Sequence, residues 1–547
     1  MSPNPHGSGP ASIACTGLTY AWPDGTPVLD GLQAAFGSGR TGLIGVNGSG
    51  KSTLLKLISG ELTPAEGTVR VAGEVGHLPQ NVTLDTAQRV DDVLGVAGTR
   101  AALHAIEAGD ASEENFTAVG DDWDVEERAA AMLSQLGLGH IGLDRTVGEV
   151  SGGESVLLRL AALLLRRPDV LLLDEPTNNL DLHARRRLYA AVDGWSGVLV
   201  VVSHDRELLD RVDQIADLRD GEIVWYGGNF SAYEEALAAE QEAAERMVRV
   251  AESDLKKQKR ELADAHVKLA RRKRYGQKMW DTKREPKVVM GERKRQAQVS
   301  AGKHRIMHEE KLAEARERLD EAVEAVRDDD EIRVDLPFTA VPPGRSVLTL
   351  RELTLAYGAR VDGELALRGP ERIALVGRNG AGKTTLLRTV AGELDPVAGE
   401  ATAHVPLRFL PQRLDVLDDG ATVAENVARF APDATANRIR ARLARFLFKG
   451  ARADQPVGTL SGGERFRATL AALMLAEPAP QLLMLDEPTN NLDMASVRGL
   501  TSALASFEGT LIVASHDVPF LESLGITRWL LLDGALKDTT REEVGAA

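Results

Sequence analysis

Cysteine is nearly absent from this sequence, in which Cys15 is the only one among 547 residues. A single thiol excludes an internal disulfide, and it excludes a zinc or iron-sulfur cluster ligated by this chain alone. Long apolar runs are absent too. No stretch approaches the roughly 18 apolar residues that a membrane span needs, and the first residues, MSPNPHGSGPAS, have no apolar signal core. We therefore expect a cytoplasmic protein that does not insert into a membrane.

Net positive charge is absent as well, because 81 Asp and Glu outnumber 65 Lys and Arg and the formal net charge is -16. Phosphate contacts need clustered Lys and Arg, so this acidity argues against binding nucleic acid over the whole surface. One block is an exception: residues 271–296 hold eleven Lys or Arg and three Asp or Glu, a net of +8, while the rest of the chain sums to -24. Such a run is usually a solvated face, and contact with a polyanion is the alternative.

What the sequence does contain is an internal repeat. A chain of 547 residues suggests two to four domains, at about 150 residues per domain. The stretches GVNGSGKST (45–53) and GRNGAGKTT (377–385) each follow apolar residues that indicate a buried strand. Both match the phosphate-loop pattern G-x-x-x-x-G-K-[ST], whose glycines let backbone N–H groups point at phosphate oxygens while the lysine reaches the outer phosphates.

The hydroxyl after each lysine is expected to contact Mg²⁺, and the helix that follows directs its positive end at the anion. A single phosphate-loop pattern can arise by chance or can belong to any kind of nucleotide-binding protein. Two such patterns in register are much more specific. The loop residues expected to bind nucleotide are Gly45, Asn47, Gly48, Ser49, Gly50, Lys51, Ser52 and Thr53 in the first copy and Gly377, Asn379, Gly380, Ala381, Gly382, Lys383, Thr384 and Thr385 in the second.

Further motifs recur in the same order. They are LPQ with Gln80 and Gln412, SGGE from Ser151 and Ser461, LDEPTNNLD at 173–181 and 485–493, and SHD with His204 and His516. The offset between copies is 332 residues as far as the glutamine, 310 at SGGE and 312 at the histidine. The chain therefore carries one domain twice, and the first copy has 22 extra residues between Gln80 and Ser151.

This succession of motifs resembles the ATP-binding cassette (ABC) ATPases over residues 10–230 and 345–540. The resemblance implies an α/β fold with two P-loop cassettes that bind ATP and Mg²⁺ and hydrolyse ATP. We expect a first cassette at 1–230 with a short arm insertion within 81–150, a helical hairpin linker at 231–341, and a second cassette at 342–547.

The apolar strands of VLLLDEP and QLLMLDEP end at Asp-Glu pairs. A buried parallel strand would deliver the aspartate to Mg²⁺ and the next glutamate to the attacking water, as general base or polarising group. The expected catalytic residues are Glu175, Glu487, His204 and His516, and the expected metal-site residues are Ser52, Gln80, Asp174, Thr384, Gln412 and Asp486.

The resemblance also implies composite sites, in which the signature of one cassette closes over ATP held by the other. Site one would join the phosphate loop of Lys51 to Ser461, Gly462 and Gly463, and site two would join that of Lys383 to Ser151, Gly152 and Gly153. Two bound ATP molecules would hold the cassettes together, and hydrolysis would release them.

An aromatic ring is expected to stack on each adenine. Tyr357 fits this position in the second copy, and aligning LTYAW with LTLAYG makes Trp22 its counterpart, with Tyr20 as second choice. Ordinary surface or core packing is the alternative for these rings. One departure bears on activity: Arg465 and Arg467 in the second signature are replaced by Ser155 and Leu157 in the first. This predicts unequal sites, with site two the weaker.

The segment between the copies predicts two long helices. Apolar residues recur every seven positions, with small residues at the alternate positions, as in a closely packed antiparallel hairpin. They are Val248, Leu255, Leu262 and Leu269 with Ala251 and Ala265, then Leu312, Leu319 and Val326 with Ala315 and Ala322. The turn is expected near 281–291, where Pro286 and Gly291 interrupt the pattern. A first helix of about 50 residues would be about 75 Å long.

Charge is separated along this hairpin, with an acidic base and a basic tip at 271–296, which favours contact with a polyanion over a merely solvated face. Tyr275, Met279 and Trp280 would stack on bases there or pack the turn. The expected RNA contacts are Arg271, Arg272, Lys273, Arg274, Lys278, Lys283, Arg284, Lys287, Arg293, Lys294 and Arg295.

Two fused cassettes with a basic helical linker resemble the ABC-F family, and PKVVMGERKRQAQVSAGK (286–303) is similar to linkers of its actinobacterial antibiotic-resistance members. The family resemblance implies a monomer whose cassettes pair with each other and whose tip enters the 70S ribosome at the tRNA exit site, toward the peptidyl-transferase centre, contacting rRNA and tRNA. Ribosomal protection against antibiotics is the leading interpretation.

Several alternatives stay open. Within the family, the alternative is an ordinary translation factor. Outside it, the chain could be the ATPase of a transporter with separate membrane chains, although a basic hairpin has no task there. A DNA-maintenance ATPase is disfavoured because the linker lies between complete cassettes, and an inactive scaffold is disfavoured because both Asp-Glu pairs are intact.

Overall fold

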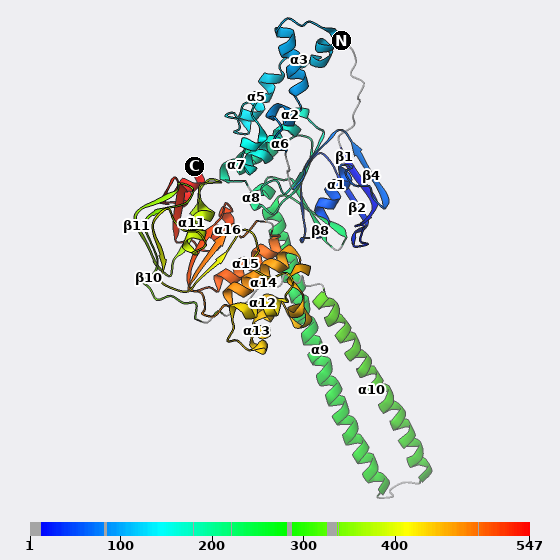
Figure 1. The fold of residues 1–547 in the computed structure, drawn as a ribbon. Helices are drawn as coiled ribbons and strands as arrows, with labels where there is room; N and C mark the ends of the chain where they lie inside the picture. The colour runs from blue at the N-terminus through cyan, green and yellow to red at the C-terminus, as the bar shows by residue number, and fades with distance from the viewer. Residues whose placement is uncertain are drawn as a thin grey trace. The chain divides into compact units, whose positions relative to one another are not determined.

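The computed structural model describes residues 12–546 apart from 81–84, 179, 220, 282–286, 325–335, 337 and 491. Between 272 and 305 the side chains described are those of Arg274, Tyr275, Lys278, Arg295 and Lys303. The chain divides into two compact units: Met1–Phe230 with Asp330–Ala547 form one, and Ser231–Asp329 form the other (Figure 1). The first unit contains both motif repeats.

The first repeat is built on a six-stranded sheet of order β5-β6-β7-β3-β8-β9, in which only the β8–β9 pairing is antiparallel. Its strands are β3 (Gly39–Ile44), β5 (Val75–Leu78), β6 (Val170–Asp174), β7 (Val198–Val202), β8 (Gln214–Arg219) and β9 (Glu222–Gly227). An antiparallel sheet of order β2-β1-β4 accompanies it, formed by β1 (Ser12–Ala21), β2 (Pro27–Phe36) and β4 (Glu66–Ala72).

The second repeat joins the equivalent strands into one nine-stranded sheet of order β13-β10-β11-β18-β17-β12-β16-β15-β14. In this sheet β10, β11 and β13 correspond to the separate antiparallel sheet of the first repeat. They join the other strands through the pairing of Arg360 on β11 with Ala535 on β18. Its strands are β10 (Arg345–Thr354), β11 (Arg360–Gly369), β12 (Arg372–Val376), β13 (Ala398–Ala403), β14 (Leu407–Leu410), β15 (Leu482–Asp486), β16 (Thr510–Ala514), β17 (Arg528–Asp533) and β18 (Ala535–Thr539).

The central parallel strands β6, β7, β15 and β16 are buried at every residue, as expected for strands covered on both faces. The helices of the first cassette are α1 (Lys51–Ile58), α6 (Gly152–Arg166), α7 (Leu182–Asp193) and α8 (Arg206–Leu209). Those of the second are α11 (Lys383–Val390), α12 (Val423–Phe430), α13 (Ala436–Leu443), α14 (Gly462–Met474), α15 (Met494–Ala505), α16 (Val518–Ser523) and α17 (Arg541–Ala546). The predicted α/β fold with two cassettes is confirmed.

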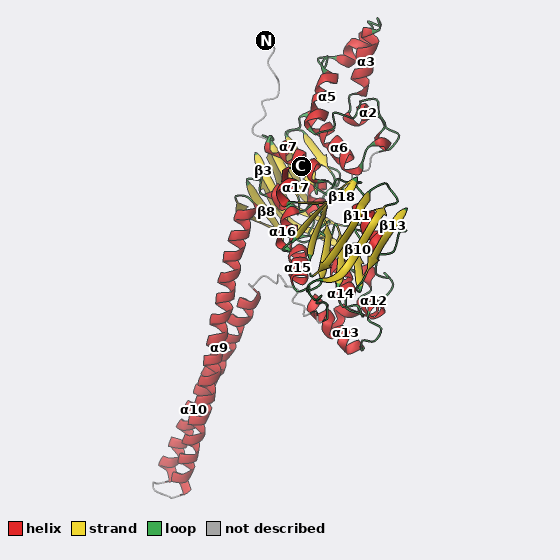
Figure 2. Cartoon of the chain, turned by 90° about the vertical axis from the view of Figure 1, so that its left-hand side faces the viewer, coloured by secondary structure: helices red, strands yellow, loops and turns green. Residues whose placement is uncertain are grey.

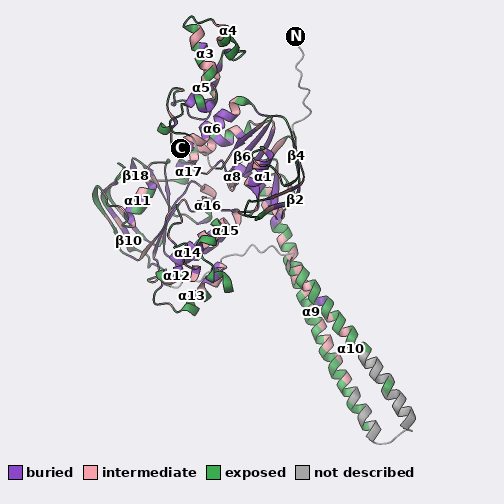
Figure 3. Cartoon of the chain, turned by 45° about the vertical axis from the view of Figure 1, so that its right-hand side comes forward, coloured by how far each residue is buried: buried purple, intermediate pink, exposed green. Residues whose placement is uncertain are grey.

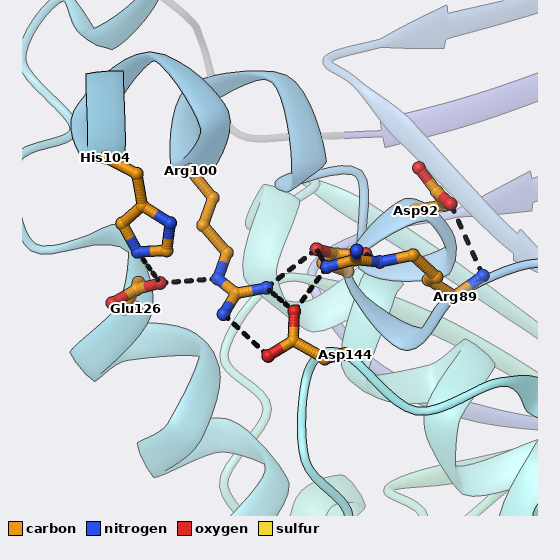
Figure 4. Close-up of polar contacts among 7 residues, drawn as sticks. Arg89, Asp92, Arg100, His104, Glu126 and Asp144 are labelled. Atoms are coloured by element: carbon orange, nitrogen blue, oxygen red, sulfur yellow. Dashed lines mark hydrogen bonds and ion pairs between the residues drawn. The ribbon is translucent and has the colours of Figure 1, made fainter. Parts of the chain in front are cut away.

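An arm of four helices follows β5 in the first repeat: α2 (Val90–Leu94), α3 (Ala97–Glu107), α4 (Glu113–Val119) and α5 (Val125–Gln135). A small apolar cluster of Ala102, Leu103, Val119 and Val125 packs it. Arg100 lies at the centre of an ion-pair group, 2.9 Å from Asp91 and 2.6 Å from Asp144, and it also contacts Glu126 (Figure 4). The arm therefore combines a small apolar cluster with a group of charge pairs.

The second unit is a helical hairpin of α9 (Phe230–Asp281), which starts at the last residue of the first unit, and α10 (Lys287–Glu324). The two helices lie side by side (Figure 2), and Arg318 pairs with Asp254 at 3.3 Å across them. Exposed residues dominate their described parts (Figure 3). No described helix is long and apolar enough to cross a membrane.

The predicted seam of the hairpin is confirmed. Ala315 is 1% exposed, and the other seam residues that are described are partly buried among exposed neighbours. Val326 and Pro286 lie outside the described residues. The prediction that Gly291 interrupts the helix is wrong, because α10 runs through it from Lys287; a single glycine costs a helix interior only about 1 kcal/mol.

Candidate functional site

Each phosphate loop connects a central strand to a helix, β3 to α1 and β12 to α11. Lys51 Nζ donates to the Gly45 carbonyl at 2.8 Å, and Lys383 Nζ donates to the Gly377 carbonyl at the same distance. Burial lowers the pKa of both lysines. A Cβ atom on Gly45 would lie 2.4 Å from the Leu218 carbonyl oxygen, so the adjacent strand leaves space for glycine alone.

The aspartates at the ends of β6 and β15 fit a Mg²⁺ site. Ser52 Oγ donates to Asp174 Oδ1 at 3.1 Å, and both carboxylate oxygens of Asp486 are buried without a hydrogen-bond partner. Burial raises the pKa of Asp174 and of Asp486. Among the described residues no cluster of three His, Cys, Asp or Glu could hold a metal alone. Mg²⁺ suits this arrangement because it takes few protein ligands and shares phosphate oxygens and water.

The glutamates that follow have a strained backbone, with φ of 48° at Glu175 and 46° at Glu487. Such left-handed conformations cost a non-glycine residue about 1–3 kcal/mol and cluster at functional sites. Burial raises the pKa of both glutamates to about 7. Glu175 Oε1 lies 3.0 Å from His204 Nε2, and Glu487 Oε1 lies 3.4 Å from His516 Nε2. Each glutamate thus faces the histidine that follows the neighbouring strand.

Both histidines are neutral near pH 7, since burial lowers the pKa of His204 to about 4 and that of His516 to about 2. His516 Nε2 accepts a hydrogen bond from Lys383 Nζ at 2.9 Å and lies 3.1 Å from Asn379 Oδ1. This contact connects the histidine directly to the phosphate loop of its own cassette.

The SGGE motifs begin helices through capping boxes. Ser151 Oγ accepts from the Glu154 backbone N–H at 3.3 Å while Glu154 Oε2 accepts from the Ser151 N–H at 2.9 Å. Ser461 and Glu464 repeat the pattern at the start of α14. Because the serine at the cap and the glutamate three residues on satisfy each other's backbone N–H groups, the helix begins here. Each start is a candidate anion site.

A cavity in the first unit brings both cassettes together at the second phosphate loop. All the catalytic and metal-site residues predicted for site two line this cavity. The signature residues of the first cassette line it as well. The lining residues are Ser151, Gly152, Gly153, Leu180, Arg185, Tyr357, Asn379, Gly380, Gly382, Lys383, Thr384, Thr385, Gln412, Asp486, Glu487, Asn490 and His516. Gly377 and Ala381 belong to the same loop but are not among the lining residues.

Contacts between the cassettes repeat at site one. Asp493 Oδ2 accepts from the Asn47 backbone N–H at 2.9 Å, and Asp181 Oδ2 accepts from the Asn379 N–H at 3.4 Å in site two. A Cβ on Gly463 would lie 2.8 Å from Ser496 Oγ, so the signature of the second cassette packs on α15, the helix capped by Asp493. Site one therefore also combines both cassettes.

The adenine candidates differ. Tyr357 is 82% exposed and lines the site-two cavity, whereas Trp22 is 40% exposed and packs edge-on against Tyr20 at 5.4 Å between ring centroids. Gln80 is exposed just beyond β5.

At the hairpin tip, Arg271, Arg274, Tyr275, Lys278 and Arg295 are exposed. The backbone of α9 or α10 contains Arg272, Lys273, Met279, Trp280, Lys287, Arg293 and Lys294, whose side chains are not described. Lys283 and Arg284 lie outside the described residues.

Sequence reasoning left Asp181, Asp493 and Arg185 out of the site. The two aspartates end the repeated LDEPTNNLD motif, and that repetition was the signal that could have found them. Arg185 has no equivalent in the second copy, so nothing in the pattern marks it.

Comparison with known proteins decides the family. The ABC transporter family model matches twice, at residues 31–178 and 362–490. The chain belongs to the ATP-binding cassette family. Its cassettes are ATPase domains, so the protein is an ATPase.

The relatives are ABC-F proteins, and this chain is an ABC-F ATPase. It is 34% identical to the "Tylosin resistance ATP-binding protein TlrC" of Streptomyces fradiae, over 93% of this chain and 95% of that protein. It is 30% identical to the "Energy-dependent translational throttle protein EttA" of Haemophilus influenzae, over 91% of this chain and 88% of that protein. The solved structure of "RNase-L Inhibitor" shares the fold, with a TM-score of 0.60 at 19% identity, over 97% of this chain and 91% of that chain.

Proposed function

We propose that this ABC-F ATPase binds the ribosome when two ATP molecules close its cassettes, and that its basic linker tip reaches the tRNA exit site toward the peptidyl-transferase centre. The observation that carries the proposal is the hairpin between two complete cassettes, with exposed Arg271, Arg274, Lys278 and Arg295 near its turn in an otherwise acidic protein. Clustered cations on a helix pair suit a folded RNA surface.

In the proposed chemistry, the phosphate loops would hold ATP. Asp174 with Ser52 in site one, and Asp486 with Thr384 in site two, would hold a Mg²⁺ ion that neutralises phosphate charge. Glu175 and Glu487 orient and deprotonate the attacking water. Neutral His204 and His516 keep the glutamate and the γ-phosphate in place. The signature helix of the opposite cassette completes each site, so that ATP binding and cassette closure are one event.

A trapped variant tests ribosome binding. Glu175→Gln with Glu487→Gln removes the general base from both sites while retaining the side-chain shape, so ATP binding and closure should persist. We expect this double variant to sediment with 70S ribosomes in ATP and not in ADP. Equal sedimentation in the two nucleotides would show that the closed state does not select the ribosome.

The position of the tip is tested by cross-linking the trapped variant through a photoreactive residue at Tyr275, which is 69% exposed. Cross-links to rRNA near the peptidyl-transferase centre and to tRNA are expected. The control is a photoreactive residue at Phe338, which is 78% exposed in the other unit. Capture of ribosomal RNA only from Phe338 would refute the role of the tip.

Protection against an antibiotic is the favoured biological role, because TlrC, at 34% identity over nearly its whole length, is named for tylosin resistance. Expression in a tylosin-sensitive host should raise the inhibitory concentration of tylosin, and the double glutamate variant should not. An unchanged concentration with intact ribosome binding would favour the alternative, a regulator of translation like the one that EttA's name describes.

A further inference from the structure

Three polar residues at four-residue spacing lie on one face at the start of α7, beginning with the last residue of the LDEPTNNLD motif of the first cassette. Asp181 caps the helix by accepting from the Ala184 N–H at 3.0 Å, and Arg185 and Tyr189 follow one and two turns later. Residues at this spacing lie above one another on a helix. Since Asp181 contacts Asn379, this face is directed toward site two.

Arg185 is held firmly in place by its own cassette. Its Nε donates to the Leu180 carbonyl at 3.2 Å and its Nη1 donates to Asp205 Oδ2, also at 3.2 Å. Tyr189 Oη donates to the same Asp205 oxygen at 2.7 Å. The side chains of Arg185 and Asp205 are only 12% and 7% exposed, so water screens this pair little. Asp205 is the residue next to His204 of site one.

Arg185 also borders a cavity that the second cassette largely lines. Arg185 lines the site-two cavity together with Glu487 and His516. Its charge acts on Asp517, the residue next to His516, as well as on Glu487. Arg185 therefore lies among acids from both cassettes: Asp205 follows the histidine of site one, and Asp517 follows the histidine of site two.

The aligned position of the second cassette carries no arginine. The offset of 312 residues aligns Arg185 with Val497 and Tyr189 with Thr501 on α15, while Asp181 and Asp205 keep their counterparts, Asp493 and Asp517. Val497 packs against the apolar core of the second cassette. At these aligned positions the cap and the acid occur in both copies, whereas the arginine occurs in the first copy alone.

We propose that Arg185 is a positioning residue that couples site one to hydrolysis at site two, in that direction only. The proposal rests on the roles assigned above to Glu175 and Glu487. The planar guanidinium has five N–H donors and can hold carboxylates from two directions, which a lysine cannot do as well. Movement of His204 and Asp205 at site one would shift Arg185, and with it the charge beside Glu487.

The test measures each site separately. In the Glu175→Gln background the remaining hydrolysis comes from site two, and in the Glu487→Gln background it comes from site one. ADP formed in the first turnover is measured at saturating ATP, together with KM, for Arg185→Val, Arg185→Lys and a control. Valine reproduces the residue present at the equivalent position of the second cassette.

We expect Arg185→Val to lower kcat at site two by about tenfold to a hundredfold, as misplacement of reacting groups does, with KM changed less than about threefold. The rate at site one should change less than about twofold. Arg185→Lys should lower kcat less than Arg185→Val does, because lysine keeps the positive charge but lacks the planar guanidinium with its several N–H donors. The control is Arg187→Val on the same helix, whose guanidinium donates to the carbonyls of Ser134 and Gln135, away from both sites.

Equal fractional losses at the two sites, or a loss matched by Arg187→Val, would mean that Arg185 only supports the fold, and the proposal would be wrong. An unchanged kcat at site two would also overturn it. If the roles assigned to Glu175 and Glu487 are wrong, the result will look different. The Glu175→Gln or the Glu487→Gln protein would then hydrolyse ATP at the full two-site rate even with Arg185 unchanged.

Discussion

The two cassettes carry the same motifs, but the residues that support those motifs differ. In the first cassette, Ser155 on the signature helix donates to the Ser151 carbonyl of its own first turn at 3.0 Å. In the second, Arg465 at the equivalent position donates to the Leu414 carbonyl at 3.0 Å and pairs with Asp419. The second cassette thus fastens the segment after Gln412 to its signature helix through a charged side chain. The first cassette has a different charged link, in which Arg185 on α7 pairs with Asp205.

The comparison shows that the two copies share the residues expected to contact ATP. They differ in the side chains that hold those residues in place. The phosphate-loop lysines make the same backbone contact in both copies, and Glu175 and Glu487 share a strained backbone. The supporting side chains differ because they need only hold a position, which several kinds of contact can achieve. This difference in support is why we expect the two sites to hydrolyse ATP at unequal rates.

The largest expected effect comes from removing the glutamates one at a time. Loss of a general base lowers the rate at that site by about 10²- to 10⁴-fold, so each single variant reports on the other site. We expect Glu487→Gln to retain more activity than Glu175→Gln, because the signature that completes site two lacks the arginines of the other. Steady-state phosphate release measures both. Equal residual rates would remove the asymmetry.

The contacts of Asp493 and Asp181 sharpen the comparison. Asparagine retains the helix cap in both cases but removes the charge that holds the phosphate-loop N–H of the other cassette. Asp493→Asn should slow site one by about tenfold, since a hydrogen bond to a charged group contributes about 1.5–3 kcal/mol. Asp181→Asn should have a smaller effect on site two, because its contact is longer, 3.4 Å against 2.9 Å. Single-turnover hydrolysis in the two glutamine backgrounds would test this, and a reversed order would refute it.

Exchange of the signature residues gives a smaller effect. Arg465→Ser releases Leu414 and Asp419, so the segment containing Gln412 should hold Mg²⁺ and ATP less tightly, raising KM a few-fold. The matched exchange, Ser155→Arg, introduces the charge in the first cassette, where Ser155 bonds only to its own helix. Nucleotide titration of both variants provides the measurement. An unchanged KM in Arg465→Ser would show that this contact does not support binding.

Substitution of Arg100 should destabilise the arm while changing the ATPase activity little. Arg100→Met leaves the side chain of Asp91, which is only 4% exposed, paired with Arg89, and it leaves Glu126 with His104. Loss of such a buried charge partner costs about 1–3 kcal/mol, here confined to the arm. Hydrogen exchange should therefore accelerate in α3 and α4 while β6 and β7 stay protected. Arg128→Met, whose partners Asp122 and Asp124 are exposed, is the control.

By itself, the sequence determined the repeat, the ATP-site motifs, the α/β class and the hairpin seam, because each depends on short local patterns. A phosphate loop needs glycines at fixed spacing, a capping box needs serine three residues before glutamate, and a helical seam needs apolar residues every seven positions. The helix through Gly291 shows the limit of such patterns, since one glycine weakens a helix without ending it.

Only the tertiary structure decided which side chains meet across the repeat. Asp181 and Asn379 are separated by 198 residues, and Arg185 joins Asp205 to a cavity built mainly by the second cassette. No periodicity links such positions, because their contact follows from how the two cassettes pack within the first unit. The fold also buries Asp486, Glu487 and His516, and burial shifts their pKa values. Sequence thus specified the reacting groups, whereas the packing of one cassette against the other set their surroundings.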